Sequence, residues 1–277
     1  MREPESVFEA PAASDKAPAD TLPTDVAELL VALGRPHAEV GRRVGPHRIH
    51  YTASFSLAPT SPIPTPKVGD TTTTSQEVED ELTLLWAPDD AEGMPHFSLR
   101  QANGSGGRET LAVDGRVYTR QSHRGWLARD VEGTLHERWL DDAARCVHDV
   151  VELAGPRVAL GAGEDGTYTL ALSGGAVDVP LPGHARSRWR ARADLEVIEG
   201  SVTLGPEGVW RHANLDVGYR LGSGDGRTLR GRVKIRAELE PLESAPAVSP
   251  PRDAVPSPER RRYAVEADEL LNGLAGR

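Results

Sequence analysis

Apolar and polar residues alternate over several long stretches of this chain, a pattern typical of half-buried β-strands. The stretch 48–57, RIHYTASFSL, places five apolar side chains on one face: Ile49, Tyr51, Ala53, Phe55 and Leu57. The same period of two recurs over 193–204, 209–221 and 227–239, which predicts a long antiparallel meander. Shorter strands are expected over 77–86, 96–102, 109–114, 116–121, 125–130 and 167–173. The pattern predicts about ten antiparallel strands.

The last two strands of the meander separate apolar from polar side chains. Between 209 and 221, Leu215 and Val217 share the apolar face, whereas Trp210 and His212 fall on the other face. The following strand carries a basic ladder on its polar face, which consists of Arg230, Arg232, Lys234 and Arg236. We expect these cations to pair across the hairpin with acids such as Asp216.

Two helices interrupt the strands. A short helix is expected over 26–33, with Thr24 or Asp25 as its N-cap and Gly34 at its end. A long helix is expected over 135–154, since Thr134 and Glu137 form a capping box before it. Its apolar stripe consists of Leu135, Trp139, Ala143, Cys146, Val150 and Leu153.

An antiparallel sheet with one apolar face needs a layer that covers that face. A helix of about 30 Å is a suitable cover. The sequence therefore predicts a mainly β (α+β) fold, in which a single large curved antiparallel sheet forms a half-open barrel covered by the long helix and the short N-terminal helix. We expect this domain to span 25–240, between a disordered tether over 1–24 and a Pro-rich linker with a C-terminal helix over 241–277.

Charge and composition exclude some classes of function. The chain has 277 residues and a net charge of −10, whereas a nucleic-acid-binding protein usually presents a basic footprint. No stretch approaches the ~20 apolar residues of a membrane-spanning helix.

Cys146 is the single cysteine, and His148 follows it by two positions. On a helix the thiol and the imidazole of residues two apart point in different directions, so they cannot act as a catalytic pair.

The sequence shows no motif for catalysis or for a bound metal. The nine histidines occur in no HExxH or clustered-ligand spacing, and the glycine-rich stretches GSGDG and NGSGG lack the strand-to-helix context of a phosphate loop. We therefore expect a protein that is not an enzyme and that takes no metal and no cofactor.

The order of the predicted elements resembles that of a known protein family. Three stretches carry this resemblance: HRIHYTASFSL (47–57), VDGRVYTRQSHRGW (113–126) and EGSVTLGPEGVWRHANLDVGYRL (199–221). Over 28–240 the chain resembles the LolA/LolB-like family of bacterial lipoprotein-localisation factors, whose lipid-binding relatives include LppX and LprG. The resemblance implies an unclosed β-barrel, plugged by helices, that binds lipid or the acyl chains of a lipoprotein. The long loop over 58–76 and the Pro-rich tail depart from the family pattern.

The resemblance implies that apolar side chains line a ligand-binding concavity. Nine are expected there: Phe55, Leu84, Trp86, Val117, Trp126, Trp139, Leu215, Val217 and Val233. Trp126 is expected to contact Trp139 near the mouth of the carrier. The same periodicity also fits a solid core, in which case the protein is a structural or interaction subunit of a cell-envelope assembly whose tails carry the binding.

Four further arginines alternate in HARSRWRARAD over 184–194, and on a strand they share one face: Arg186, Arg188, Arg190 and Arg192. Such a row protects an edge strand against pairing with another chain. The alternative is a basic lip that meets anionic lipid headgroups or an acidic partner.

The resemblance also implies a periplasmic location. One hypothesis is an outer-membrane lipoprotein without its signal peptide, in which Met1 stands in place of the acylated cysteine. The alternative is a cytoplasmic protein that starts at Met1 with a flexible tail. The expected partners are lipid or an acylated lipoprotein, an envelope protein contacted through the tails, and the membrane surface through an N-terminal lipid anchor, with no nucleic acid.

Overall fold

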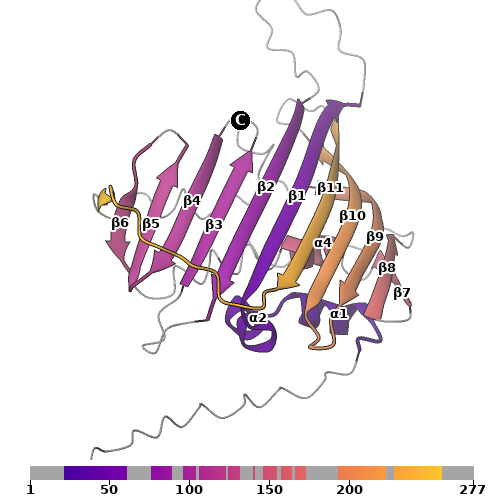
Figure 1. The fold of residues 1–277 in the computed structure, drawn as a ribbon. Helices are drawn as coiled ribbons and strands as arrows, with labels where there is room; N and C mark the ends of the chain where they lie inside the picture. The colour runs from indigo at the N-terminus through magenta and orange to yellow at the C-terminus, as the bar shows by residue number, and fades with distance from the viewer. Residues whose placement is uncertain are drawn as a thin grey trace, which may run out of the picture.

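The structure is a computed structural model, and it describes residues 22–60, 76–88, 96–103, 106–122, 124–131, 140, 146–154, 157–163, 166–172, 193–222 and 228–257 (Figure 1). The fold is mainly β, as predicted. The strands are β1 (His47–Pro59), β2 (Gln76–Ala87), β3 (His96–Asn103), β4 (Gly106–Val113), β5 (Arg116–Gln121), β6 (Leu127–Asp130), β7 (Val158–Ala162), β8 (Thr167–Leu172), β9 (Ala193–Leu204), β10 (Trp210–Gly222), β11 (Thr228–Pro241) and β12 (Val255–Pro256).

All twelve strands belong to one sheet, in the order β12-β6-β5-β4-β3-β2-β1-β11-β10-β9-β8-β7. Neighbours are antiparallel except for β12, which runs parallel to β6. The pairing of β1 with β11 joins two meanders that are far apart in sequence. The sheet is open and does not curl, so the predicted half-open barrel is wrong in this respect. Closure requires the end strands to pair, and here the ends are the two-residue β12 and the five-residue β7.

Three helices are described, α1 (Val26–Leu33), α2 (His37–Val44) and α4 (Cys146–Ala154). Of the two predicted caps it is Asp25 that acts, since its Oδ1 accepts the backbone N–H of Glu28 at 2.9 Å. The sequence did not predict α2, which begins directly after Pro36.

The predicted long helix is not seen as such in the described part of the chain. Its described residues are Leu140 and the nine of α4, and the rest of 135–154 lies outside them. The described buried side chains of α4 are those of Val147, His148, Val150 and Val151. Of the predicted stripe, Val150 is the residue whose side chain is described, and it is buried; the side chains of the other five lie outside the described ones.

The main core lies between the helices and one face of the sheet, which we call the inner face. Leu29 and Leu33 of α1 and the valines of α4 pack there against inward residues of β1, β2, β10 and β11. Phe55 pairs with Val233, and Val233 with Val217, so one row of apolar side chains crosses three strands. This is the apolar face that the alternation predicts.

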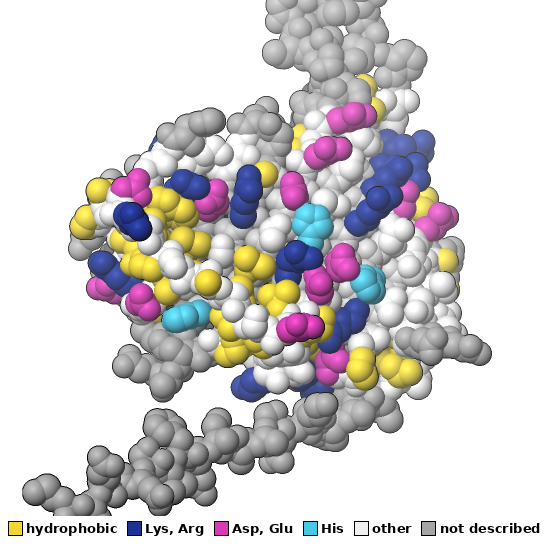
Figure 2. All heavy atoms as spheres, in the orientation of Figure 1, with side chains coloured by type: hydrophobic (Ala, Val, Ile, Leu, Met, Phe, Trp, Pro, Cys, Tyr) yellow, Lys and Arg dark blue, Asp and Glu magenta, His cyan; other side chains and the backbone are white. Residues whose placement is uncertain are grey.

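The opposite face of the sheet, here the outer face, is strongly charged over β9–β11. Arg232 donates from Nε and Nη2 to the two carboxylate oxygens of Asp216, both at 2.6 Å. Arg230 donates to the carboxylate of Glu196 at 2.8 and 3.3 Å. The predicted pairing of the basic ladder across the hairpin is therefore confirmed for Arg232, and Figure 2 shows the cations and acids interleaved on this face.

Trp210 differs from the prediction. The alternation places it with His212 on the polar face, but its side chain is only 1% exposed, like that of Val209. The pairing of β10 with β9 is irregular between Trp210 and His212. A local bulge shifts the side chains that precede it relative to those that follow, so both Val209 and Trp210 reach the core.

The Pro-rich segment after β11 is folded against the sheet. Residues 242–257, which we call the strap, cross the outer face and end in β12 (Figure 1). The sequence pattern predicts a Pro-rich linker for this segment. The predicted C-terminal helix lies over 258–277, outside the described residues, as do 1–21 of the predicted tether.

Candidate functional site

A buried pair of histidines lies where α2 meets the start of β1. The ring centroids of His37 and His47 are 5.1 Å apart, and the ring of Trp86 stacks on His47 at 5.2 Å. Burial lowers the pKa of both histidines, and for His37 the nearby His47 adds to this effect. The pKa of His47 falls to about 4, although its hydrogen bond to the carbonyl oxygen of Gly45 opposes the shift. At neutral pH these rings are uncharged and serve as packing groups.

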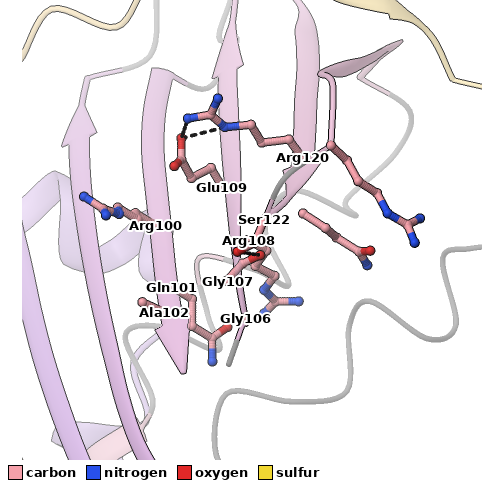
Figure 3. Close-up of a pocket in the computed structure, with 11 residues that line it drawn as sticks. Arg100, Gln101, Ala102, Gly106, Gly107, Arg108, Glu109, Arg120 and Ser122 are labelled. Atoms are coloured by element: carbon pink, nitrogen blue, oxygen red, sulfur yellow. Dashed lines mark hydrogen bonds and ion pairs between the residues drawn. The ribbon is translucent and has the colours of Figure 1, made fainter. Parts of the chain in front are cut away.

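An arginine-lined pocket lies at the ends of β3, β4 and β5. Its volume is about 310 Å³, within the range of small-ligand sites. Eleven residues line it: Arg100, Gln101, Ala102, Gly106, Gly107, Arg108, Glu109, Arg120, Gln121, Ser122 and Arg124. Figure 3 shows these side chains around the end of the β3–β4 hairpin.

Strand register brings three of the charged side chains into one row on the outer face. Arg100 pairs with Glu109, and Glu109 pairs with Arg120. Arg120 donates from Nε and Nη2 to Oε2 of Glu109, at 3.1 and 2.8 Å, while Arg100 extends away from that carboxylate (Figure 3). Arg120 also lies over the ring of Trp126, 4.5 Å from its centroid. Glu109 is therefore neutralised by Arg120.

A second row of side chains reaches the pocket from the inner face and consists of Gln101, Arg108 and Gln121.

The loop after β5 is held by Ser122, whose N–H and hydroxyl donate to the carbonyl oxygen of Gly107 at 2.7 and 3.1 Å. A side chain at Gly107 would have its Cβ 2.8 Å from the carbonyl oxygen of Gln101, so the strands approach closely here only because glycine lacks one.

The pocket is basic although the whole chain is acidic. Four arginines face one glutamate there, against a net charge of −10 for the chain. Within the described residues, the guanidinium groups of Arg100 and Arg124 take part in no hydrogen bond or ion pair. Two exposed guanidinium groups beside a neutralised Glu109 favour an anion with phosphate or carboxylate oxygens.

The described lining of the pocket offers cationic groups that suit the binding of an anion. The ionisable side chains that line the pocket are the four arginines and Glu109, and the hydroxyl of Ser122 is engaged with Gly107. No group of three or more His, Cys, Asp or Glu side chains that is suited to a metal ion occurs in the described part of the chain. None of its described helices is long and apolar enough to span a membrane.

The nine side chains predicted to line a concavity divide into three sets. Seven belong to the main core, each no more than 7% exposed: Phe55, Leu84, Trp86, Val117, Leu215, Val217 and Val233. Trp126 lies on the outer face, in a separate cluster with Val113, Tyr118 and Ala128. Trp139 lies outside the described residues, so its expected contact with Trp126 stays a prediction. The basic row of Arg186, Arg188, Arg190 and Arg192 also lies outside them.

Sequence reasoning missed the arginine pocket. Its four arginines come from β3, β4, β5 and the loop after β5, at separations that show no local pattern. Only the register of three strands brings them together. The available signal was the glycine pair that ends the β3–β4 hairpin, which marks a place where backbones approach closely.

Comparisons with known proteins assign no family to this chain. No protein-family model matches it, and no curated protein matches it. Its structure resembles that of the S-type phycobiliprotein lyase CPES from Guillardia theta, with 11% identity, a TM-score of 0.20, and coverage of 75% of this chain and 94% of that one. A putative AttH from Nitrosomonas europaea gives 9% identity and a TM-score of 0.21, with 83% of this chain and 59% of that chain covered. These weak similarities to β-sheet proteins carry no argument about function.

Proposed function

We propose that this protein is a non-enzymatic binding protein for anionic lipids of the bacterial cell envelope, and that the arginine pocket receives the lipid headgroup. The observation that carries the proposal is the pair of exposed guanidinium groups, Arg100 and Arg124, in a basic pocket of about 310 Å³. Arginine forks match the oxygens of a phosphate or carboxylate. The sequence resemblance to LolA/LolB-like lipid-binding proteins and their periplasmic location supports the choice of a lipid.

Charge contrast gives the pocket its selectivity in this proposal. An acidic surface repels anions in general, while a local cluster of arginines attracts them at short range. Basic groups at a membrane surface gain attraction from anionic headgroups, and salt screens this attraction. The protein therefore binds anionic lipid more tightly than zwitterionic lipid, and less tightly at high ionic strength.

A second candidate function, an interaction subunit of an envelope assembly, is favoured by one observation. Seven of the predicted ligand-lining side chains pack into a continuous core with α1 and α4. In that case the outer face and the tails carry the binding of a protein partner. Binding of purified lipid vesicles distinguishes the two functions.

Replacing Arg100 and Arg124 together by glutamine is expected to weaken binding to vesicles that contain anionic phospholipid. Loss of about 1.5 kcal/mol of charge-assisted hydrogen bonding at each arginine predicts a roughly 100-fold lower affinity. The measurement is vesicle co-sedimentation at low salt, with purely zwitterionic vesicles as the second arm. Inorganic phosphate, added as a soluble competitor, separates recognition of a free anion from recognition of a lipid surface.

The matched control is Arg236→Gln, which removes an exposed arginine from the outer face of β11, outside the pocket. This variant is expected to bind like the unchanged protein, within about twofold, because surface charges far from a site act weakly. Equal binding of anionic and zwitterionic vesicles would disprove the proposal. So would an equal loss in the control variant and in the pocket variant.

A further inference from the structure

The strap is held to the sheet mainly at its two ends. Leu242 donates its backbone N–H to the carbonyl oxygen of Pro46 at 2.8 Å. At the far end, Val255 donates to the carbonyl oxygen of Trp126 at 3.0 Å and Ser257 to that of Ala128 at 2.8 Å. Within the described residues, no backbone hydrogen bond joins 243–254 to the sheet.

The composition of the strap explains this weak attachment. Pro246, Pro250 and Pro251 have no N–H to donate, so the segment cannot form a continuous strand. Within the described residues its only strand pairing is the two-residue β12, and Val255 is 54% exposed. Segments with few buried contacts and few backbone hydrogen bonds open at low free-energy cost.

The strap covers an apolar patch on the outer face, which we call the outer cluster. The patch consists of Val113, Tyr118, Trp126 and Ala128. From the strap, Val248 and Ala254 pack on it. Figure 2 shows apolar side chains gathered over β3–β6, whereas the outer face over β1, β10 and β11 is charged.

The outer cluster adjoins the arginine pocket. Trp126 belongs to the cluster, and its ring lies 4.5 Å below the guanidinium of Arg120, which lines the pocket. Tyr118 is separated from Arg120 by one residue on the same face of β5, and both project outward. A basic pocket is thus continuous with an apolar patch, which is the complement of an amphiphile with an anionic head.

We infer that the outer cluster is the chain-binding half of the headgroup site, and that the strap is a lid which an acyl chain displaces. The inference rests on the proposed function, because it extends the lipid from its headgroup to its chain. The head lies among the arginines, and the chain replaces Val248 and Ala254 on Trp126 and Tyr118. The strap then competes with the lipid for the same surface.

A disulfide that fixes the strap tests this inference in the full chain. Val255 and Leu127 are direct partners of the parallel β12–β6 pair, and neighbouring strands are spaced within the reach of a disulfide. The variant combines Leu127→Cys and Val255→Cys with Cys146→Ser, so that only one bond forms. Its matched control carries Val255→Cys and Cys146→Ser alone.

The probes are methyl phosphate and decyl phosphate, the latter below its micelle concentration, and binding is measured by calorimetry. In the reduced protein, decyl phosphate is expected to bind at least about tenfold more tightly than methyl phosphate, because buried methylenes add affinity. In the oxidised protein this gain is expected to vanish, while binding of methyl phosphate stays unchanged. The control is expected to keep the gain under both conditions.

The outcomes separate the two proposals. If methyl phosphate binds and the oxidised variant keeps the chain-length gain, the strap is not a lid and the inference fails alone. If neither phosphate binds in any state, the proposed headgroup site fails as well. If the internal bond does not form and a disulfide-linked dimer appears in its place, positions 127 and 255 are not held side by side as the seated strap requires, which also overturns the inference.

A second variant acts in the opposite direction. Val248→Gln removes an apolar contact between the strap and the outer cluster without adding charge. A loosened lid competes less, so decyl phosphate is expected to bind several-fold more tightly, with methyl phosphate unaffected. Unchanged or weaker binding of decyl phosphate contradicts the role of the strap as a lid.

Discussion

Lowering the pH from 7 to 4 is expected to reduce the free energy of unfolding by about 3 kcal/mol through His47 alone. Burial lowers the pKa of this histidine to about 4 in the folded protein, from an ordinary value of 6.5. The unfolded chain therefore binds a proton that the folded chain excludes, and stability falls as the pH drops below 6.5. The loss continues until the pH reaches the folded value near 4.

His37 adds to this loss, because burial and its neighbour His47 also lower its pKa. The charge of Arg211 acts on His47 in the same direction. The measurement is urea unfolding at pH 7, 6, 5 and 4. Most of the change in the free energy of unfolding is expected between pH 6.5 and 4. The upper part of this range lies above the pH at which carboxylates usually titrate, so the change there reports the histidines.

The control for the acid sensitivity compares two histidine substitutions. His47→Gln removes the buried titrating ring and is expected to flatten the decline of stability between pH 6.5 and 5. His212→Gln removes a ring whose side chain is 63% exposed, and is expected to leave the decline unchanged. Equal slopes in the unchanged protein and in His47→Gln would show that the buried ring is not the cause.

Gly200→Ala is expected to destabilise the protein by about 3 to 5 kcal/mol, from backbone strain together with overpacking. Gly200 has a φ of +146°, a conformation that favours glycine, in the middle of β9. An added Cβ would overlap the carbonyl oxygen of Asn214 and lie 2.9 Å from Cα of Leu215. These are backbone atoms of β10, so the strand pair itself has to move. Guanidinium unfolding measures the loss.

Gly218→Ala is the matched control for this substitution. It lies on β10, and an added Cβ would find its nearest atom, Cβ of Val197, at 3.5 Å, an ordinary contact. We expect a change of less than about 1 kcal/mol. A similar loss in both variants would mean that glycine content, and not the close approach at Gly200, controls stability here.

The strands were predictable because their information is local. Over 48–57 the period of two names the buried residues of β1 correctly, and 193–204 coincides with β9. The N-cap of α1 was readable for the same reason, since Asp25 and Glu28 are three residues apart. In each case the residues that decide the structure lie within a few positions of one another.

The shape of the sheet was not predictable from the same pattern. The alternation of apolar and polar residues indicates that a strand has two different faces. It does not indicate whether the sheet closes or how its ends are covered. Trp126 illustrates the limit. It is apolar and follows the alternation, yet it belongs to the outer cluster, because the strap gives the outer face its own apolar contacts.

At the candidate site, too, some features follow from the local sequence and others depend on the tertiary structure. The sequence by itself determined that the protein is mainly β, where most strands run, and that cations on β11 pair with acids across the hairpin. Only the tertiary structure decided that Arg100, Arg108 and Arg120 meet at one pocket, that Trp126 lies beside it, and that the strap covers Trp126. The physical reason is that strand propensity acts over neighbouring residues, whereas these contacts depend on the register between strands and on a segment that returns from more than a hundred residues away.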